Sequence, residues 1–299
     1  EDGIRDDLVT GVQTCALPIL YKKDIKMAQW NKITQEYDNQ NKSNFEVFIC
    51  ADRYGNIGNC GGDGIGGIGI SAGDYDNISA VHKFGLVEGT NSSEWSTIWT
   101  PSDSASTILY PWGHSPGVVS VTSTSSEDLQ SGIGTSVIRV QGLDSDYNPI
   151  QDDIPLSGTT PSSGQIIFAR VFRAFSVIGN TNIGDINITI NGVLVSQISE
   201  GYGQTLQCIY TIPSGKTGYL KNISTSTSKQ QPMILGIFQK PFDGVFRVAS
   251  TISLYQMSAN QTFEVPIKLE EKSDIDVRIK GSTNATVSCD FEVILIDNG

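Results

Sequence analysis

From Val118 to the end of the chain, short β-type segments alternate with turn residues. The segments VVSVTSTS, SVIRVQGL, PIQDDIPL, GQIIFARVFRAFSVI and DINITINGVLVSQI follow one another at short spacing and alternate in polarity or are rich in β-branched residues. Gly, Asn, Asp and Pro, the usual turn formers, stand between them. Asn191-Gly192 lies between two such segments and is the strongest local signal for a hairpin. The pattern predicts an all-β fold with little helix.

The strand pattern falls into two groups, one over residues 117–202 and one over residues 203–299. Many short strands with regularly spaced turns are typical of β-sandwiches, jelly rolls among them. Near the C-terminus, apolar residues alternate with polar ones from Val287 to Leu295. This predicts a half-buried strand with Cys289 in the core. We therefore expect two consecutive jelly-roll-like β-sandwich domains.

Residues 27–116 lack this pattern, apart from one plausible strand over Phe45–Ala51. The segment holds a glycine-rich run at 61–70 and, further on, three of the four tryptophans. We expect an irregular Gly-rich and Trp-rich N-terminal arm that precedes the two sandwiches.

The aromatic residues of this arm are its candidate contact residues: Trp95, Trp99, Tyr110 and Trp112. Clustered aromatic rings can stack on sugars or bases, or they can anchor a segment on a neighbouring subunit. No basic residues stand between the rings, which favours the second interpretation. Ile98, Ile108 and Leu109 add apolar surface that must be covered by the sandwiches of the chain or by a partner. We expect the arm to anchor a homo-oligomer, with a trimer favoured among closed symmetric assemblies.

Two glycine-containing segments invite a nucleotide-binding interpretation. A dinucleotide loop needs a strand before it and a helix after it, and GGDGIGGIGI at 61–70 is followed by SAGDYDNIS, which has no helical apolar face. PSGKTGYL at 213–220 lacks the first glycine of a phosphate loop and is predicted to be a hairpin turn. We expect no nucleotide and no other cofactor.

Catalytic residues are not evident. His82 and His114 are the only histidines, and either can be drawn with Glu94 or Asp103 as a Ser-His-Asp arrangement. No Gly-x-Ser-x-Gly nucleophile segment accompanies them. We therefore expect a protein that is not an enzyme.

Metal ligands are not evident either. DSDYN at 144–148 has the spacing of the first three ligands of a calcium loop, but Pro149 and Pro155 occupy the positions of the loop glycine and glutamate. A turn in which Asp and Asn bond their own backbone is the preferred interpretation.

Charge and cysteine usage limit the partners. The chain carries a net charge of −12 and no basic cluster, so we expect no nucleic-acid partner. It has no apolar run long enough to span a bilayer, so we expect no membrane partner. Cys50, Cys60, Cys208 and Cys289 are scattered, which predicts reduced, buried thiols in a protein assembled in the cytoplasm.

The first residues resemble no other part of the chain. Residues 10–19, TGVQTCALPI, and residues 1–6, EDGIRD, resemble the in-frame translation of a short-read sequencing adapter. We expect residues 1–26 to be non-native, with 20–26 as read-through and Met27 as the start.

The remaining segments resemble an uncharacterised family of structural proteins of marine tailed bacteriophages. The resemblance covers residues 81–297 and is carried by VHKFG (81–85), IRVQGLDSDYN (138–148), LSGTTP (156–161), GQTLQCIYTIPSGKTGYL (203–220), KPFDGVFRV (240–248) and PIKLEEKSDIDVRI (266–279). It implies a virion protein that acts as a head fibre, a capsid decoration or a tail-fibre component and has other virion proteins as partners. The alternative is a carbohydrate-binding β-sandwich module with a host-surface glycan as its partner.

Overall fold

The computed structural model describes residues 49–51, 57–59, 67–90, 93–100, 109–255 and 257–299. The chain divides into two compact units, Glu1–Ala72 and Gly73–Gly299. Residues 1–26, which we expect to be non-native, lie outside the described residues.

The described residues of the first unit form one small antiparallel pair and one short helix. Strand β1 (Ile49–Ala51) pairs with β2 (Ile57–Asn59), and helix α3 (Gly67–Ser71) ends the glycine-rich run. The helix has only five residues, and the rest of the run lies outside the described residues.

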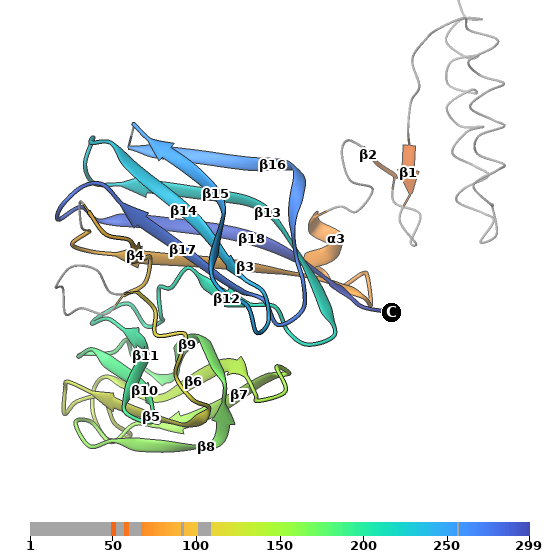
Figure 1. Ribbon diagram of the computed structural model, residues 1–299. Helices are drawn as coiled ribbons and strands as arrows, with labels where there is room; N and C mark the ends of the chain where they lie inside the picture. The colour runs from red at the N-terminus through yellow and green to blue at the C-terminus, as the bar shows by residue number, and fades with distance from the viewer. Residues whose placement is uncertain (1–48, 52–56, 60–66, 91–92, 101–108, 256) are drawn as a thin grey trace, which may run out of the picture. The chain divides into compact units, whose positions relative to one another are not determined.

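The second unit is all-β and contains two sandwiches (Figure 1). The first sandwich has one sheet in the order β11-β10-β5-β8 and another in the order β7-β6-β9. Its strands are β5 (Gly117–Ser123), β6 (Thr135–Leu143), β7 (Pro149–Pro155), β8 (Ser162–Phe168), β9 (Arg170–Gly179), β10 (Ile186–Ile190) and β11 (Val193–Ile198). Its apolar core draws on residues outside 117–202 as well, since Trp99, Tyr110, Trp112 and Ile209 belong to it.

The hairpin between β10 and β11 has the turn that its sequence predicts. Asn191 and Gly192 both have positive φ, at 50° and 79°, as a two-residue hairpin turn requires. The turn directs Ile186, Ile188 and Ile190 into the core, where all three are fully buried.

The segment GQIIFARVFRAFSVI forms two strands instead of one. Strand β8 ends at Phe168 and β9 begins at Arg170, and the two strands belong to different sheets. The chain therefore passes from one layer to the other at Ala169, which is buried.

The second sandwich pairs the sheet β12-β17-β14-β15 with the sheet β16-β13-β18-β3. A short strand, β4, extends the first of these sheets by pairing with β17. The strands are β3 (Ile78–Val87), β4 (Ser96–Thr97), β12 (Ile209–Thr211), β13 (Lys216–Thr227), β14 (Met233–Lys240), β15 (Arg247–Leu254), β16 (Ser258–Leu269), β17 (Asp274–Lys280) and β18 (Val287–Asp297). Strand β18 alternates as predicted, and Cys289 is in the core.

Residues 78–87 and 96–97 belong to this second sandwich, as strands β3 and β4, and not to an irregular arm. Strand β3 pairs with β18 over its whole length, from Ile78 opposite Ile296 to Val87 opposite Val287. The sequence of β3 lacks the apolar–polar alternation of a strand, because Lys83 and Gly85 occupy inward positions where apolar residues are expected. Gly85 is required there, because a Cβ atom would lie 2.5 Å from the backbone nitrogen of Cys208. In the described part of the chain, no helix is long and apolar enough to cross a membrane.

Candidate functional site at the junction of the two sandwiches

A set of loops meets where the two sandwiches touch. The turn 144–148 follows β6 of the first sandwich, and the loops 213–215, 241–246 and 270–273 belong to the second. The Ser214 N–H donates to the Tyr147 carbonyl at 2.9 Å, and the rings of Tyr147 and Phe242 lie 5.6 Å apart. Segments that carry the sequence resemblance are therefore brought together at this junction.

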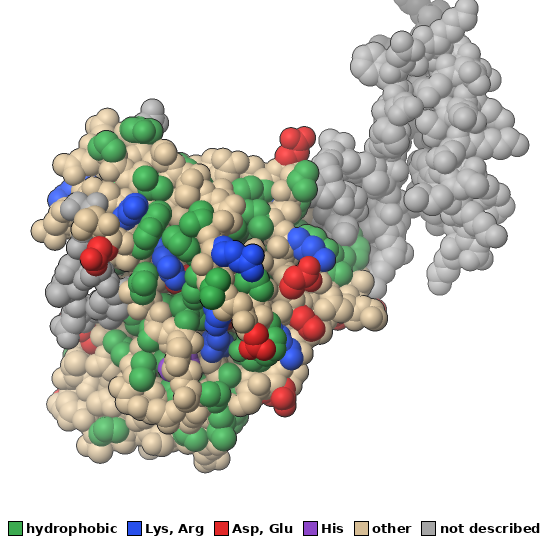
Figure 2. All heavy atoms as spheres, viewed as in Figure 1, with side chains coloured by type: hydrophobic (Ala, Val, Ile, Leu, Met, Phe, Trp, Pro, Cys, Tyr) green, Lys and Arg blue, Asp and Glu red, His purple; other side chains and the backbone are tan. Residues whose placement is uncertain are grey.

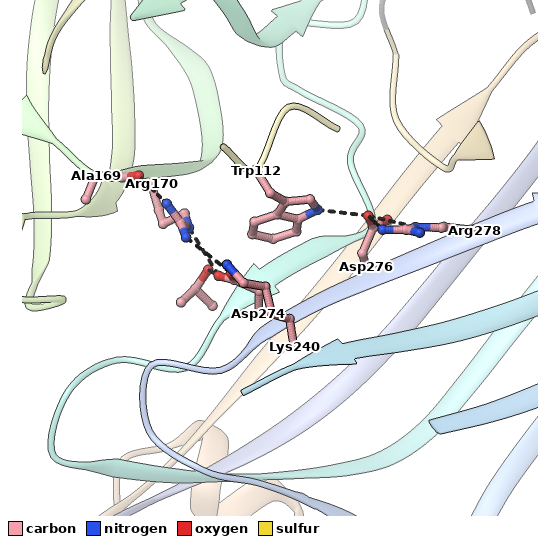
Figure 3. Close-up of polar contacts among 8 residues, drawn as sticks. Trp112, Ala169, Arg170, Lys240, Asp274, Asp276 and Arg278 are labelled. Carbon is pink, nitrogen blue, oxygen red and sulfur yellow. Dashed lines mark hydrogen bonds and ion pairs between the residues drawn. The ribbon is translucent and has the colours of Figure 1, made fainter. Parts of the chain in front are cut away.

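Arg170 and Asp274 form the central ion pair of the junction (Figure 3). Arg170 Nε donates to Asp274 Oδ1 and Nη2 donates to Oδ2, both at 3.1 Å. Thr211 Oγ1 donates to Oδ1 at 2.7 Å, and Lys240 Nζ lies 3.5 Å from Oδ2. Burial alone would lower the pKa of Arg170, but the hydrogen bonds and charge of Asp274 outweigh this effect and raise it. The guanidinium therefore stays charged at the junction.

Asp276 forms a second buried polar centre two residues further along β17. Its Oδ2 accepts from Trp112 Nε1 at 2.8 Å and from Arg278 Nη2 at 2.8 Å, and its Oδ1 accepts from Thr97 Oγ1 at 2.9 Å. Figure 3 shows the indole N–H of Trp112 pointing at this carboxylate. Burial raises the pKa of Asp276, and the charge of Arg278 with the hydrogen bonds from Arg278, Trp112 and Thr97 opposes the rise. The Trp112 side chain belongs to the core of the first sandwich, so this bond also joins the two domains.

Three of the four expected contact residues form an aromatic cluster with edge-to-face contacts inside the chain. Ring centroids lie 5.2 Å apart for Trp99 and Tyr110, 4.8 Å for Tyr110 and Trp112, and 5.5 Å for Trp112 and Phe246. Trp99, Tyr110 and Trp112 are only 2%, 3% and 9% exposed. The sandwiches of the chain itself cover these rings, so they are not available to a partner on this folded unit.

Trp95 and the smaller apolar residues are placed differently. Trp95 is half-buried against Phe238, at a centroid distance of 5.1 Å, and Lys280 Nζ lies 4.8 Å from its ring centroid. Ile98 is fully buried, whereas Leu109 is exposed. Ile108 lies outside the described residues.

The two histidines do not share a site. His82 on β3 has its Nε2 atom 3.4 Å from Asp290 Oδ1. His114 has its Nδ1 atom 3.3 Å from the Ser115 carbonyl, and burial lowers its pKa. Glu94 is exposed, and Asp103 lies outside the described residues.

The segment 144–148 forms the turn that its sequence predicts. Asp144 Oδ1 accepts from the backbone N–H groups of Asp146 at 2.9 Å and Asn148 at 2.8 Å. Desolvation raises the pKa of Asp144, but the hydrogen bonds from Asn148, Asp146 and Tyr147 together outweigh it and lower the pKa. Among the described residues, no group of three His, Cys, Asp or Glu side chains is placed to hold a metal ion.

In the segment 213–220, residues 213–215 form a turn between β12 and β13, and residues 216–220 already belong to β13. Gly215 has a φ of 72°, which suits glycine, and its N–H donates to Glu271 Oε2 at 2.6 Å. The predicted hairpin is wrong, because β12 and β13 belong to different sheets, and this turn instead carries the chain from one sheet to the other beside the loop 270–273.

Backbone strain gathers at the rim of the junction. Tyr147, Asp243 and Lys272 all have positive φ, at 70°, 55° and 60°. Lys272 Nζ lies 5.8 Å from the Tyr147 ring centroid and 5.3 Å from that of Phe242. Left-handed conformations in such residues persist only where surrounding contacts hold them, so the rim is tightly fixed.

The charged residues of the junction were not expected from the sequence. Asp274, Asp276 and Arg278 occupy alternate positions of β17, a pattern that equally fits a solvated strand face. The one available signal was Arg170, a charge inside the apolar run FARVF. Its partner lies 104 positions away, and local patterns contain no information on that pairing.

Neither the family models nor the curated proteins include a match to this chain. The chain is weakly similar to solved structures of infectious bursal disease virus and of a lipoprotein from Bacteroides thetaiotaomicron. For the Gx strain of the virus the identity is 10% over 75% of this chain and 72% of that chain, with a TM-score of 0.22. For the Gt strain the identity is 11% over 74% and 73%, with a TM-score of 0.18. For the lipoprotein it is 8% over 72% and 100%, with a TM-score of 0.20. At such TM-scores these likenesses carry no argument about function.

Proposed function

We propose that the chain is a non-enzymatic structural protein of a virion, a head fibre, capsid decoration or tail-fibre component. The observation that carries this proposal is the buried polar junction between the sandwiches. Domains in one chain move relative to each other by default unless their interface fixes them. Here Arg170–Asp274 and Trp112–Asp276 both connect the sandwiches through buried, directional hydrogen bonds. A stiff pair of sandwiches suits a protein that holds an outer domain at a fixed distance from its support.

The surface chemistry supports the same role. The net charge of −12 opposes binding to nucleic acid during assembly in a host cytoplasm. On the face in Figure 2, Lys and Arg side chains are scattered among hydrophobic and acidic ones and form no continuous basic patch. The sequence resemblance to phage structural proteins points to the same class.

The proposal includes a homo-oligomer, with a trimer favoured. Because Trp99, Tyr110 and Trp112 are buried within the chain, the contact must use another surface. Strands β15 and β16 are edge strands of their sheets. Exposed apolar side chains lie on these strands and on the loops beside them. These are Val245, Val248, Tyr255, Met257 and Val265. A second and third copy of the chain would cover them.

Mass spectrometry of purified particles tests virion membership. Particles from cells infected with a phage that carries this gene are separated on a density gradient and digested. We expect peptides of this chain in the same fractions as the capsid peptides, at a constant ratio across the peak. Peptides confined to the soluble fraction of the lysate would contradict the proposal.

A further inference from the structure

A polar hollow lies on the face of the second sandwich that carries strands β13, β16 and β18. Its volume is about 390 Å³. It is lined by Ser224, Thr225, Ser226, Ser258, Ala259, Asn260, Ser288 and Asp290. A volume of this order falls within the range of small-molecule sites.

The strand register arranges the polar side chains as a grid. Ser226 lies opposite Ser258 on one side and Ser288 on the other. Ser224 lies in the same way between Asn260 and Asp290. Neighbouring strands are about 4.8 Å apart, and alternate residues of a strand share a face, so all six side chains point to the same side. Five of the six are serine or asparagine, which are smaller than the side chains around them. The middle of this face is therefore a shallow depression.

Larger side chains limit the grid on its β3 side. Phe84 lies opposite Asp290, and Leu86 lies opposite Ser288. Both are half-buried, and the ring of Phe84 lies 6.2 Å from that of His82. The hollow therefore has hydroxyl, amide and carboxylate groups beside a partly exposed aromatic ring.

Most of the hydrogen-bonding capacity in the hollow is not used by the protein. Ser226 Oγ and Ser288 Oγ bond each other at 2.6 Å. Asp290 has only the 3.4 Å contact with His82 at its carboxylate. Among the residues that the structure describes, the side chains of Ser224, Ser258 and Asn260 have no hydrogen-bond partner. The site thus offers free donors and acceptors in a fixed arrangement.

We infer that this hollow binds a neutral saccharide unit of a surface glycan. Sugar hydroxyls both donate and accept, which matches a set of serine hydroxyls, one amide and one carboxylate. The C–H face of a sugar ring packs on aromatic rings, which Phe84 offers at the edge. Asp290 and the adjacent Glu292 on β18, with the net charge of −12, disfavour sialic and uronic acids. The inference goes beyond the structural role and does not depend on it.

A glycan array provides the test. The fluorescently labelled full chain is applied to immobilised neutral hexose and N-acetylhexosamine glycans and to glycans that end in sialic or uronic acid. We expect retention on a subset of the neutral glycans. Asp290→Ala removes the carboxylate, and Ser226→Val replaces a central hydroxyl with a methyl group and adds a second methyl group on Cβ. We expect each to reduce retention by about tenfold or more, because a site built to bond hydroxyls loses strongly when a partner is removed.

Ser253→Val is the matched control, because Ser253 is exposed on β15 in the other sheet of the same sandwich. It should bind as the unaltered chain does. Thermal unfolding of all three variants checks the fold. If Asp290→Ala lowers the melting temperature, the inference is judged on the glycan binding of Ser226→Val alone. Retention on no neutral glycan, a preference for anionic glycans, or equal binding by Ser226→Val would overturn the inference. None of these results alters the distribution of the chain in purified particles, so failure here is distinct from failure of the proposed structural role.

Discussion

Arg170 on β9 and Asp274 on β17 join the two sandwiches through a buried ion pair with two hydrogen bonds of 3.1 Å. A buried ion pair contributes little net stability compared with a well-packed apolar pair, because both charges must be desolvated. Its geometry is nevertheless strict, since each charge requires its partner in one orientation. The junction therefore fixes the position of one sandwich on the other more than it strengthens either.

The first prediction concerns the loss of one partner of this pair. Arg170→Met leaves Asp274 buried with only the more distant Lys240 as a counter-charge, at 3.5 Å. We expect the free energy of unfolding to fall by about 3–5 kcal/mol, measured by urea denaturation. Arg139→Met is the control, because Arg139 bonds Asp153 with the same two-point geometry at 2.7 Å on the surface. That change should have little effect. Equal losses of unfolding free energy from the two variants would show that the burial of Arg170 and Asp274 does not determine the loss.

The second prediction concerns the indole of Trp112. Trp112→Phe keeps an aromatic ring next to Tyr110 and Phe246 but removes the donor to Asp276. We expect a loss of about 1.5–3 kcal/mol in the free energy of unfolding, since the lost bond is to a buried charge. Trp95→Phe keeps a ring next to Phe238 and removes an indole N–H that, among the described residues, does not bond Asp274 or Asp276, so it should cost less. A larger loss of unfolding free energy from Trp95→Phe would argue against a stabilising hydrogen bond between Trp112 and Asp276.

Features that depend on neighbouring residues could be predicted from the sequence. The all-β class, the Asn191-Gly192 turn and the alternation of β18 around Cys289 are confirmed, because each is set within a few residues. Strand β3 was missed because Lys83 and Gly85 face inward, which removes the apolar alternation. Those two residues are accommodated by Phe172 and Cys208, which lie far along the chain.

The candidate site required knowledge of tertiary pairing. The sequence identifies Trp99, Tyr110 and Trp112 as rings that must be covered, but it does not show which surface covers them. The structure shows that the chain's own sandwiches do so. The grid of polar side chains on β13, β16 and β18 could not be predicted from the sequence either. Ser224, Asn260 and Asp290 become neighbours only through the register of these three strands.

The third prediction concerns pH and the buried Lys83. Burial lowers the pKa of Lys83 from 10.5 to about 7, and its Nζ donates to the Phe172 carbonyl. Between these values the unfolded chain binds more protons at this position than the folded chain, so stability rises with pH. Below pH 7 both states are charged, and the cost of burying the charge is fully present.

The free energy of unfolding of the unaltered chain should therefore rise from pH 7 to pH 10 relative to that of Lys83→Met, which lacks the titrating group. Urea denaturation at several pH values measures this difference, which we expect to change by a few kcal/mol in total. The exposed Lys268 is the control, because its pKa is raised through Glu270 and Lys268→Met should give no such rise near pH 7. A flat difference for Lys83→Met would show that Lys83 stays charged in the folded chain.

The fourth prediction concerns the N-terminal residues. If residues 1–26 are non-native, their deletion should leave the melting temperature of the chain unchanged in differential scanning calorimetry. A decrease of several degrees corresponds to about 1 kcal/mol of lost packing and would contradict the adapter hypothesis.

The fifth prediction concerns self-association through the outer strands of the second sandwich. Val265 on β16 is 84% exposed and Tyr255 beside β15 is 72% exposed, which is unusual for apolar side chains of this size. We expect light scattering to find the full chain as an oligomer, most simply a trimer, at tens of micromolar. Val265→Glu places a charge in the contact and should shift the mass toward the monomer. Ile133→Glu changes an equally apolar, 66% exposed residue of the first sandwich and should leave the mass unchanged. A monomeric unaltered chain would rule out self-association and leave docking on another virion protein as the role of these strands.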